Sequence, residues 1–129
     1  MNKNKESNTK FYLYYILPII IYCAGIFYLS SQTIIPGPAG TQLINDKIKH
    51  AILYLGLSIL TYRAAVQTKF RKYAYVVAIL FTTIYGITDE LHQSFVPGRI
   101  YSIADMIANA IGASLILINK RKKGKRAHR

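Results

Sequence analysis

Acidic residues are scarce in this chain, and their scarcity makes their positions informative. There are five of them against 17 lysines and arginines, which gives a formal net charge of +12. Glu6 lies in the polar N-terminal region, whereas Asp46, Asp89, Glu90 and Asp105 lie at the ends of apolar segments. Because ionisable groups at a membrane edge are costly, these four carboxylates are the first candidates for a functional role.

Cysteine is almost absent as well. The single Cys23 lies within the first apolar segment, so one chain can form no internal disulfide and offers no thiol cluster to a metal ion. Cysteine usage therefore says nothing about the compartment, which has to be inferred from hydropathy and charge.

Hydropathy favours a small polytopic membrane protein. The 129 residues have room for one domain, and 52% of them are hydrophobic, with a mean hydropathy of +0.21, which is too apolar for an ordinary soluble domain of this size. Four apolar stretches are candidates for spanning helices: Phe11–Leu29, Ile48–Tyr62, Tyr73–Thr88 and Ile103–Ile118.

These stretches become long enough to cross a bilayer only when flanking polar residues are included. A spanning helix needs about 20 residues, and only the first stretch approaches that length by itself. We therefore predict an all-α bundle of four transmembrane helices within a single domain, residues 1–129. The predicted helices cover residues 11–30, 46–66, 73–93 and 101–119.

The first predicted helix also resembles a secretory signal, because lysines precede its apolar core. That core is longer than a signal core, and Ser30-Ser31-Gln32 matches a cleavage site poorly, so a retained helix is favoured. Pro18 lies two turns inside this helix and predicts a kink or a locally unwound turn.

Basic residues predict the orientation in the membrane. Three lie in the N-terminal region, four between Arg63 and Lys72, and seven after Asn119, whereas the intervening connections carry only Lys47, Lys49 and Arg99. By the positive-inside rule, both termini and the Arg63–Lys72 loop are cytoplasmic. The four unusual acids then face the extracytoplasmic side.

The basic tail over residues 120–129 has two interpretations. A run of lysine and arginine can bind nucleic acid, but this one directly follows an apolar helix. Its position favours an electrostatic anchor on the anionic inner leaflet, and no nucleic-acid partner is expected.

The polar residues form pairs at helical spacing. Asp46 and His50 share a helix face with Tyr54, Asp89 pairs with Gln93, and Asp105 pairs with Asn109 above Gly112, which offers close helix approach. Charges near hydrocarbon have to be neutralised, and basic residues are available nearby. The predicted functional cluster consists of Asp46, Lys47, His50, Asp89, Glu90, Gln93, Arg99, Asp105 and Asn109.

Simpler structural roles exist for part of this cluster. Asp105 follows Ser102 at the spacing of a capping box, and Asp46 lies at a predicted helix start, where a carboxylate favours the helix dipole. Asp89 and Glu90 lie near a helix C-terminus, where the dipole disfavours negative charge. We expect their partners among Arg99, Lys47, Lys49 and protonated His50.

Metal and serine chemistry receive less support. His50 and His92 are the candidate metal ligands, but their spacing is not that of a zinc protease, so no cofactor is predicted and a divalent metal stays an alternative. Ser94 or Ser102 could act as a nucleophile with either histidine, although no glycine turn exposes them.

The turn Ser94-Phe95-Val96-Pro97-Gly98-Arg99 ends in a cation. Pro97 and Gly98 enforce the turn, and a guanidinium at headgroup level suits bidentate contact with a phosphate or carboxylate. An intramolecular pair of Arg99 with Asp89, Glu90 or Asp105 is the alternative.

The sequence resembles the VanZ-like family of small bacterial membrane proteins over most of its length. The resemblance lies in Ser30-Ser31-Gln32, in Asp46-Lys47 followed by His50, and in the string from Asp89 to Arg99 followed by Ser102, Asp105, Asn109 and Gly112. The founding member of that family is associated with resistance to the glycopeptide teicoplanin.

The resemblance implies a role in antibiotic access or envelope-lipid handling, with the cluster engaging a lipid-linked cell-wall precursor or a glycopeptide. A non-enzymatic role is favoured. One alternative is a membrane enzyme acting on a lipid-linked phosphate or ester, with Asp89 or Glu90 as base, His50 as acid and Arg99 stabilising negative charge. Another is a non-catalytic helix bundle that binds a partner. The small size is also compatible with a homo-oligomer.

Overall fold

The fold was analysed in a computed structural model that describes residues 3–32 and 41–118. All regular elements in these two ranges are helical, and neither range contains a strand. In chain order the elements are α1 (Lys3–Phe11), the π-helical η1 (Tyr12–Ile16), α2 (Leu17–Ser30), α3 (Thr41–Ala65), the short 3-10 helix η2 (Arg71–Tyr73), α4 (Ala74–Gln93) and α5 (Ile103–Ser114).

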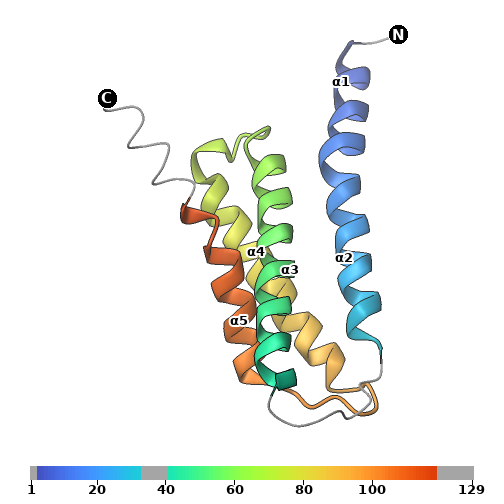
Figure 1. The fold of residues 1–129 in the computed structure, drawn as a ribbon. Coiled ribbons are helices and arrows are strands. Elements are labelled where there is room, and N and C mark those ends of the chain that lie inside the picture. Colours follow the sequence, from blue (N-terminus) through green and yellow to red (C-terminus); the bar gives the residue numbers. More distant parts are fainter. Residues whose placement is uncertain (1–2, 33–40, 119–129) are drawn as a thin grey trace.

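The helices run alternately up and down (Figure 1). α1, η1 and α2 form one rod, α3 returns beside it, α4 runs back, and α5 runs parallel to α3. Helices α3, α4 and α5 pack against one another, while the rod approaches them mainly through α2. The ends of α2 and α4 and the starts of α3 and α5 therefore lie at the same end of the bundle.

Small residues and tyrosines hold the helices together. Ile26 of α2 packs with Tyr54 and Leu57 of α3 in the buried core. Gly112 of α5 lies so close to α3 that a Cβ placed on it would be 2.7 Å from the Cα of Ala51, inside contact distance. The predicted close approach at Gly112 is thus confirmed, and it joins α5 to α3.

The helix containing Pro18 changes geometry where the sequence predicts it. Proline has no N–H to donate to the preceding turn, and the residues just before it, Tyr12–Ile16, are π-helical. The N–H of Leu17 bonds to the carbonyl of Tyr12, which is one residue further back than in an α-helix. The predicted local unwinding therefore takes the form of a single wider turn.

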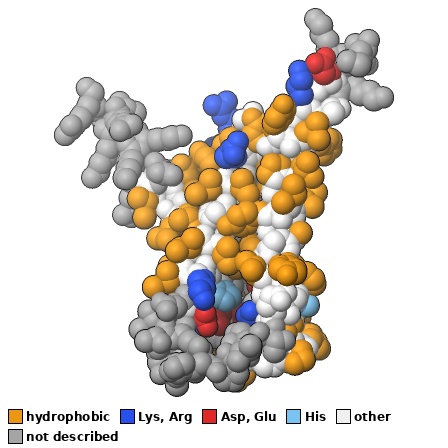
Figure 2. All heavy atoms as spheres, turned by 45° about the vertical axis from the view of Figure 1, so that its right-hand side comes forward, with side chains coloured by type: hydrophobic (Ala, Val, Ile, Leu, Met, Phe, Trp, Pro, Cys, Tyr) orange, Lys and Arg blue, Asp and Glu red, His pale blue; other side chains and the backbone are white. Residues whose placement is uncertain are grey.

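The bundle is apolar outside, and polar side chains are buried within it beside the hydrophobic core. Large apolar side chains are exposed along the helices, for example Ile52 at 63% and Ile84 at 60%, whereas Glu90 and Thr82 are fully buried. Figure 2 shows a hydrophobic surface over the middle of the bundle, with charged side chains toward its two ends. A lipid-facing exterior with internal polar groups is the arrangement expected in a membrane.

The length of two helices also indicates association with a membrane. Two helical stretches, Glu6–Ser30 with 25 residues and Arg71–Gln93 with 23, are long and apolar enough to cross a bilayer. α3 is of comparable length but carries Asp46, Lys47, Lys49 and His50 in its first half. These features indicate membrane association, together with an all-helical fold.

The observed helix ends differ from the predicted ones by more than two residues in three places. The first helix already begins at Lys3, the second begins five residues early at Thr41, and the fourth ends at Ser114 rather than 119. The third agrees within one residue. Polar residues without special turn chemistry extend a helix readily, so hydropathy sets its ends less well than its existence. The basic tail, 120–129, lies outside the described residues.

Candidate functional site

Four polar segments that are distant in sequence meet at one end of the bundle. They follow or end α2 and α4, and they begin α3 and α5. Direct contacts join them: Gln93 to Ser30, Tyr54 to Asp89, His50 to Asn109, and Glu90 to Ser102. The structure thus brings together most of the predicted cluster, but it divides the cluster between two faces of α4.

One face of α4 carries Glu90, which lies against the start of α5. Its Oε1 accepts a hydrogen bond of 2.7 Å from the backbone N–H of Ser102, and its side chain is fully buried. Ser102 is the N-cap residue of α5, and its hydroxyl accepts from the N–H of Asp105 at 3.2 Å. The predicted cap is therefore confirmed, with Glu90 of another helix taking the role of the reciprocal acceptor.

Because Glu90 completes this cap, the carboxylate of Asp105 is available for another partner. It forms a partly buried ion pair with Lys47 of α3. One turn deeper, His50 Nδ1 lies 2.9 Å from Oδ1 of the buried Asn109. These contacts join α3, α4 and α5 into one polar face, which we call the Glu90 side: Lys47, His50, Glu90, Ser102, Asp105 and Asn109.

The other face of α4 carries Asp89. Its Oδ2 accepts from Tyr54 Oη at 2.9 Å and from Gln93 Nε2 at 3.0 Å. Gln93 Nε2 also lies 3.2 Å from the hydroxyl oxygen of Ser30 at the end of α2. Asp89 therefore links α4 to both α2 and α3 through neutral donors.

Arg99 extends this second face into the α4–α5 loop. Its Nη1 donates to Gln93 Oε1 at 3.0 Å, its Nε to the carbonyl of Gln32 at 3.0 Å, and its Nη2 to the carbonyl of Leu29 at 3.1 Å. A cation at a helix C-terminus is favourable because the last carbonyls lack helical partners. We call this set the Asp89 side: Ser30, Tyr54, Asp89, Gln93 and Arg99.

The expected charge partners of the buried acids differ from those observed. Within residues 3–32 and 41–118, the structure records no salt bridge from Asp89 or Glu90, and Arg99 binds backbone carbonyls and an amide instead of a carboxylate. The end of α2 lies beside Arg99 in the fold, although Leu29 and Arg99 are 70 residues apart in the chain. The acids are held by neutral hydrogen-bond donors.

Both buried carboxylates keep unused hydrogen-bonding capacity. Among the described residues, Asp89 Oδ1 and Glu90 Oε2 have no hydrogen-bond partner, and neither does the Nδ2 of Asn109. Buried polar atoms are normally paired, because an unpaired one costs about 1–3 kcal/mol. Together with Thr82 Oγ1, these atoms leave unpaired polar groups inside the described bundle.

Asp46 lies apart from this network. It forms a largely exposed ion pair with Lys49 at 3.3 Å. Because α3 begins at Thr41, Asp46 is not in the first turn, so its assignment to a helix start is wrong. Asp46 shares a helix face with His50, but its carboxylate pairs with Lys49, the residue before His50.

The two histidines have separate surroundings. His92 stacks on Phe27 with a centroid distance of 4.3 Å, and its Nε2 lies 3.0 Å from the Ser31 hydroxyl oxygen. His50 lies on the Glu90 side. Over the described part of the chain, no three His, Cys, Asp or Glu side chains gather as they would around a metal ion.

The two serines that the sequence offers as nucleophiles bond to backbone groups. The hydroxyl of Ser94 donates to the carbonyl of Leu91, and Ser102 caps α5. Ser31 is the serine next to a histidine, but its hydroxyl hydrogen points to the carbonyl of Phe27 at 2.7 Å. None of the three has the arrangement of a serine activated by a base.

Sequence reasoning left Ser30 and Tyr54 out of the predicted cluster. Tyr54 lies one turn from His50 on the same helix face, and Ser30 belongs to the first polar segment after an apolar helix. Both signals are visible in the sequence. The sequence does not show their hydrogen-bond partners, because both Tyr54 and Ser30 bond to α4, which is far away along the chain.

Comparison with known proteins gives one match. The sequence model of the family described as VanZ/LLP1 matches residues 11–118, a range that contains both sides of the polar network. No curated protein and no solved structure shows significant similarity to the chain.

Proposed function

The chain belongs to the VanZ/LLP1 family, and on that premise we propose that it is a four-helix protein of the bacterial cytoplasmic membrane with both termini in the cytoplasm. The apolar exterior and two span-length helices support this placement. The uneven distribution of lysine and arginine supports the orientation. In this orientation the polar network lies at the extracytoplasmic end.

We further propose that the protein acts at that face in handling envelope lipid or a cell-wall precursor, and that it thereby lowers susceptibility to glycopeptides such as teicoplanin. The observation that carries this proposal is the pair of unpaired oxygens on Asp89 and Glu90. Carboxylates inside an apolar bundle destabilise it unless they are paired, so their presence favours a ligand.

The chemistry of the free atoms narrows the ligand. Carboxylate oxygens accept hydrogen bonds, so Asp89 and Glu90 would bind hydroxyl, amide N–H or ammonium groups rather than a phosphate. Asn109 Nδ2, which lies on the Glu90 side, would donate to a carbonyl or hydroxyl oxygen of the group that Glu90 binds. Lipid-linked cell-wall precursors and glycopeptides both offer sugar hydroxyls and peptide amides.

In this proposal Arg99 does not bind a phosphate directly. Three of its N–H groups already bond within the protein, to Leu29, Gln32 and Gln93. It holds the end of α2 against α4, and Gln93 connects it to Asp89. Arg99 would therefore position the Asp89 carboxylate.

Amide substitutions test the role of the two carboxylates. Asp89→Asn and Glu90→Gln keep side-chain size but remove the charge, and we expect each to lose most of the teicoplanin protection that the unchanged protein gives a susceptible strain. Asp46→Asn is the matched control, since this exposed carboxylate at the same end lies outside the network. The readouts are the minimal inhibitory concentration and the amount of protein in the membrane.

Three outcomes would contradict the proposal. The proposed resistance is wrong if cells with the unchanged protein are as susceptible to teicoplanin as cells with an empty vector. The role of the carboxylates is wrong if well-expressed Asp89→Asn and Glu90→Gln variants protect fully. Conversion of a bacterial lipid extract by the purified protein, seen by mass spectrometry, would instead place the protein among enzymes.

A non-catalytic interaction bundle is the second candidate, and the bonding of Arg99 favours it. A guanidinium that closes the end of a neighbouring helix serves a stable scaffold as well as a binding site. In that case Asp89→Asn would lower the thermal stability of the purified protein in proportion to its loss of protection. A loss of protection at unchanged stability favours ligand binding.

A further inference from the structure

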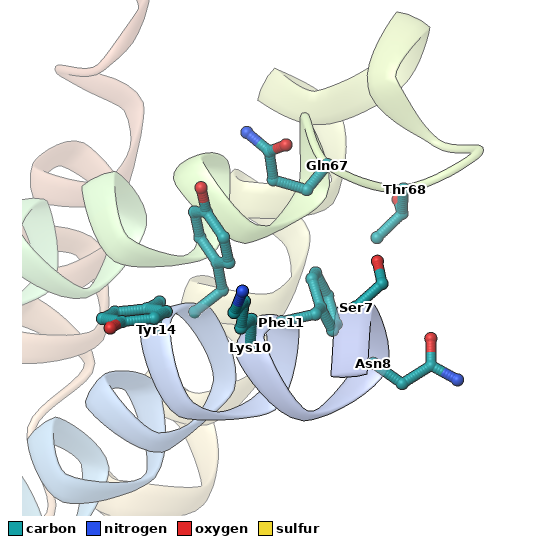
Figure 3. A pocket seen from close by; sticks show the side chains of 8 residues that line it. Ser7, Asn8, Lys10, Phe11, Tyr14, Gln67 and Thr68 are labelled. Atoms are coloured by element: carbon teal, nitrogen blue, oxygen red, sulfur yellow. The ribbon is translucent and has the colours of Figure 1, made fainter. Parts of the chain in front are cut away.

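A pocket lies at the opposite end of the bundle from the polar network. It has a volume of about 490 Å³ and lies between the N-terminal helical rod and the loop that follows α3. Figure 3 shows Ser7 and Phe11 directed toward the segment that carries Gln67 and Thr68. The pocket shares no residue with the Asp89 side or the Glu90 side.

One stripe of the rod supplies most of the lining. Ser7, Phe11 and Tyr14 recur at the spacing of a single helix face, and Lys10 adjoins them. Gln67 and Thr68 close the pocket from the other side. The lining thus combines aromatic rings with hydroxyl, amide and ammonium groups.

The pocket lies at the level of a membrane interface if the rod spans the bilayer. The Glu6–Ser30 stretch has 25 residues and is therefore about 37 Å long, against about 30 Å for the hydrocarbon core. Its first turns must extend into the headgroup region. Tyr12 and Tyr14, exposed at 61% and 68%, are the amphipathic side chains typical of that region.

Charge at this end favours an anionic occupant. Among the described side chains here, one acid, Glu6, stands against five cations: Lys10, Arg63, Lys69, Arg71 and Lys72. Lys10 pairs with Glu6 at 2.8 Å, but both side chains are largely exposed, and such pairs contribute little. The Lys10 ammonium can therefore exchange Glu6 for a phosphate at small cost.

We propose that this pocket binds the headgroup of an anionic glycerophospholipid from the leaflet that faces the basic end. The phosphate lies at Lys10, and the glycerol hydroxyls bond to Ser7 and Gln67, for whose side chains the described structure records no hydrogen bond. The acyl chains extend along the exposed apolar surface of the rod, which includes Leu13 and Leu17. A free phosphate lacks this apolar part, so the lipid is the favoured ligand.

The π-helical turn contributes to this site. η1 carries Tyr14 and follows Phe11 directly, and wide turns of this kind recur at functional sites in helices. Pro18 has no N–H to donate and so favours the wider turn. The sequence feature that perturbs the first helix therefore lies next to the residues that line the pocket.

Native mass spectrometry of the full chain, reconstituted in vesicles of equal parts phosphatidylglycerol and phosphatidylcholine, tests the proposal. The unchanged protein should retain phosphatidylglycerol in preference. Lys10→Gln should lower that preference about fivefold, as expected when one specific contact to the lipid phosphate is lost. Ser7→Phe should lower it by filling the pocket without changing any charge.

Lys72→Gln is the matched control, because it removes the same charge at the same end from a residue outside the pocket. It should leave the preference close to that of the unchanged protein. An equal loss in Lys10→Gln and Lys72→Gln would overturn the proposal in favour of general attraction to the membrane. No preference in the unchanged protein, or full preference in Ser7→Phe, would also overturn it. Protection against teicoplanin is measured separately and tests the other end.

Discussion

Asp89 and Glu90 are neighbours in the chain, yet they belong to different parts of the molecule. Asp89 accepts from two side chains, Tyr54 of α3 and Gln93 of its own helix, and Gln93 in turn bonds to Ser30 of α2. Glu90 faces the start of α5 and accepts from one backbone N–H, that of Ser102. One buried carboxylate joins helices through side chains, and the other joins them by capping a helix.

This difference shows that the short α4–α5 loop holds groups on both sides in place. The α4–α5 connection supplies Arg99 to the Asp89 side and Ser102 to the Glu90 side. A change in the path of this loop would thus affect both carboxylates together. Substitutions within the helices should affect Asp89 and Glu90 separately.

The largest effect is expected at Gly112, which holds α5 against α3 on the Glu90 side. A Cβ at this position meets the backbone of Ala51, which cannot rotate away, so Gly112→Ala should destabilise the protein by about 3 kcal/mol. Gly25→Ala is the matched control, because nothing lies within 4 Å of a Cβ there. Thermal unfolding of both variants in the same detergent measures the difference, and equal stabilities would disprove the close contact.

A smaller effect distinguishes the two carboxylates themselves. Asp89→Ala leaves two buried donors without their acceptor and should cost about 2 kcal/mol, whereas Glu90→Ala leaves one and should cost about 1 kcal/mol. The variants share the helix, the new residue and the depth of burial. Denaturant unfolding followed by circular dichroism gives the order, and a larger cost for Glu90→Ala would reverse the comparison.

An effect as small as that of Glu90→Ala is expected at Arg99. Lys cannot reproduce its three hydrogen bonds, so Arg99→Lys should cost about 1 kcal/mol and loosen the end of α2. Amide hydrogen exchange should speed up near Leu29 and stay unchanged near Ser102. Arg63→Lys, at an exposed position at the other end, is the control. Faster exchange at both places would show that the two sides are not separate.

Much of the fold could be predicted from hydropathy and spacing. The third helix agrees within one residue, because its apolar stretch ends in a polar turn with Pro97 and Gly98. The early start of α3 at Thr41 was not predicted, since only Leu43 and Ile44 are apolar among residues 41–45 and the predicted helix therefore began at Asp46. Helix ends in polar sequence depend on tertiary contacts and solvent, which hydropathy does not describe.

The candidate site shows a similar division. Spacing identified the Ser102–Asp105 cap and the close approach at Gly112, because both depend on helix geometry. Spacing did not identify the partner of Arg99. Charge alone favoured a carboxylate, whereas Arg99 bonds to backbone carbonyls at the end of α2. A carbonyl at a helix end leaves no signature in the residue type that carries it.

Hydropathy and helical period are local properties, so the sequence predicted four spanning helices with polar residues at their ends; over the described residues the structure is all-helical, and two of its helices are long and apolar enough to span a membrane. Tertiary structure alone decided which donor each carboxylate meets. Asp89 and Glu90 differ by one position, or about 100° around the helix, and that angle sends them toward different neighbours. Those neighbours are set by how α2, α3 and α5 pack around α4.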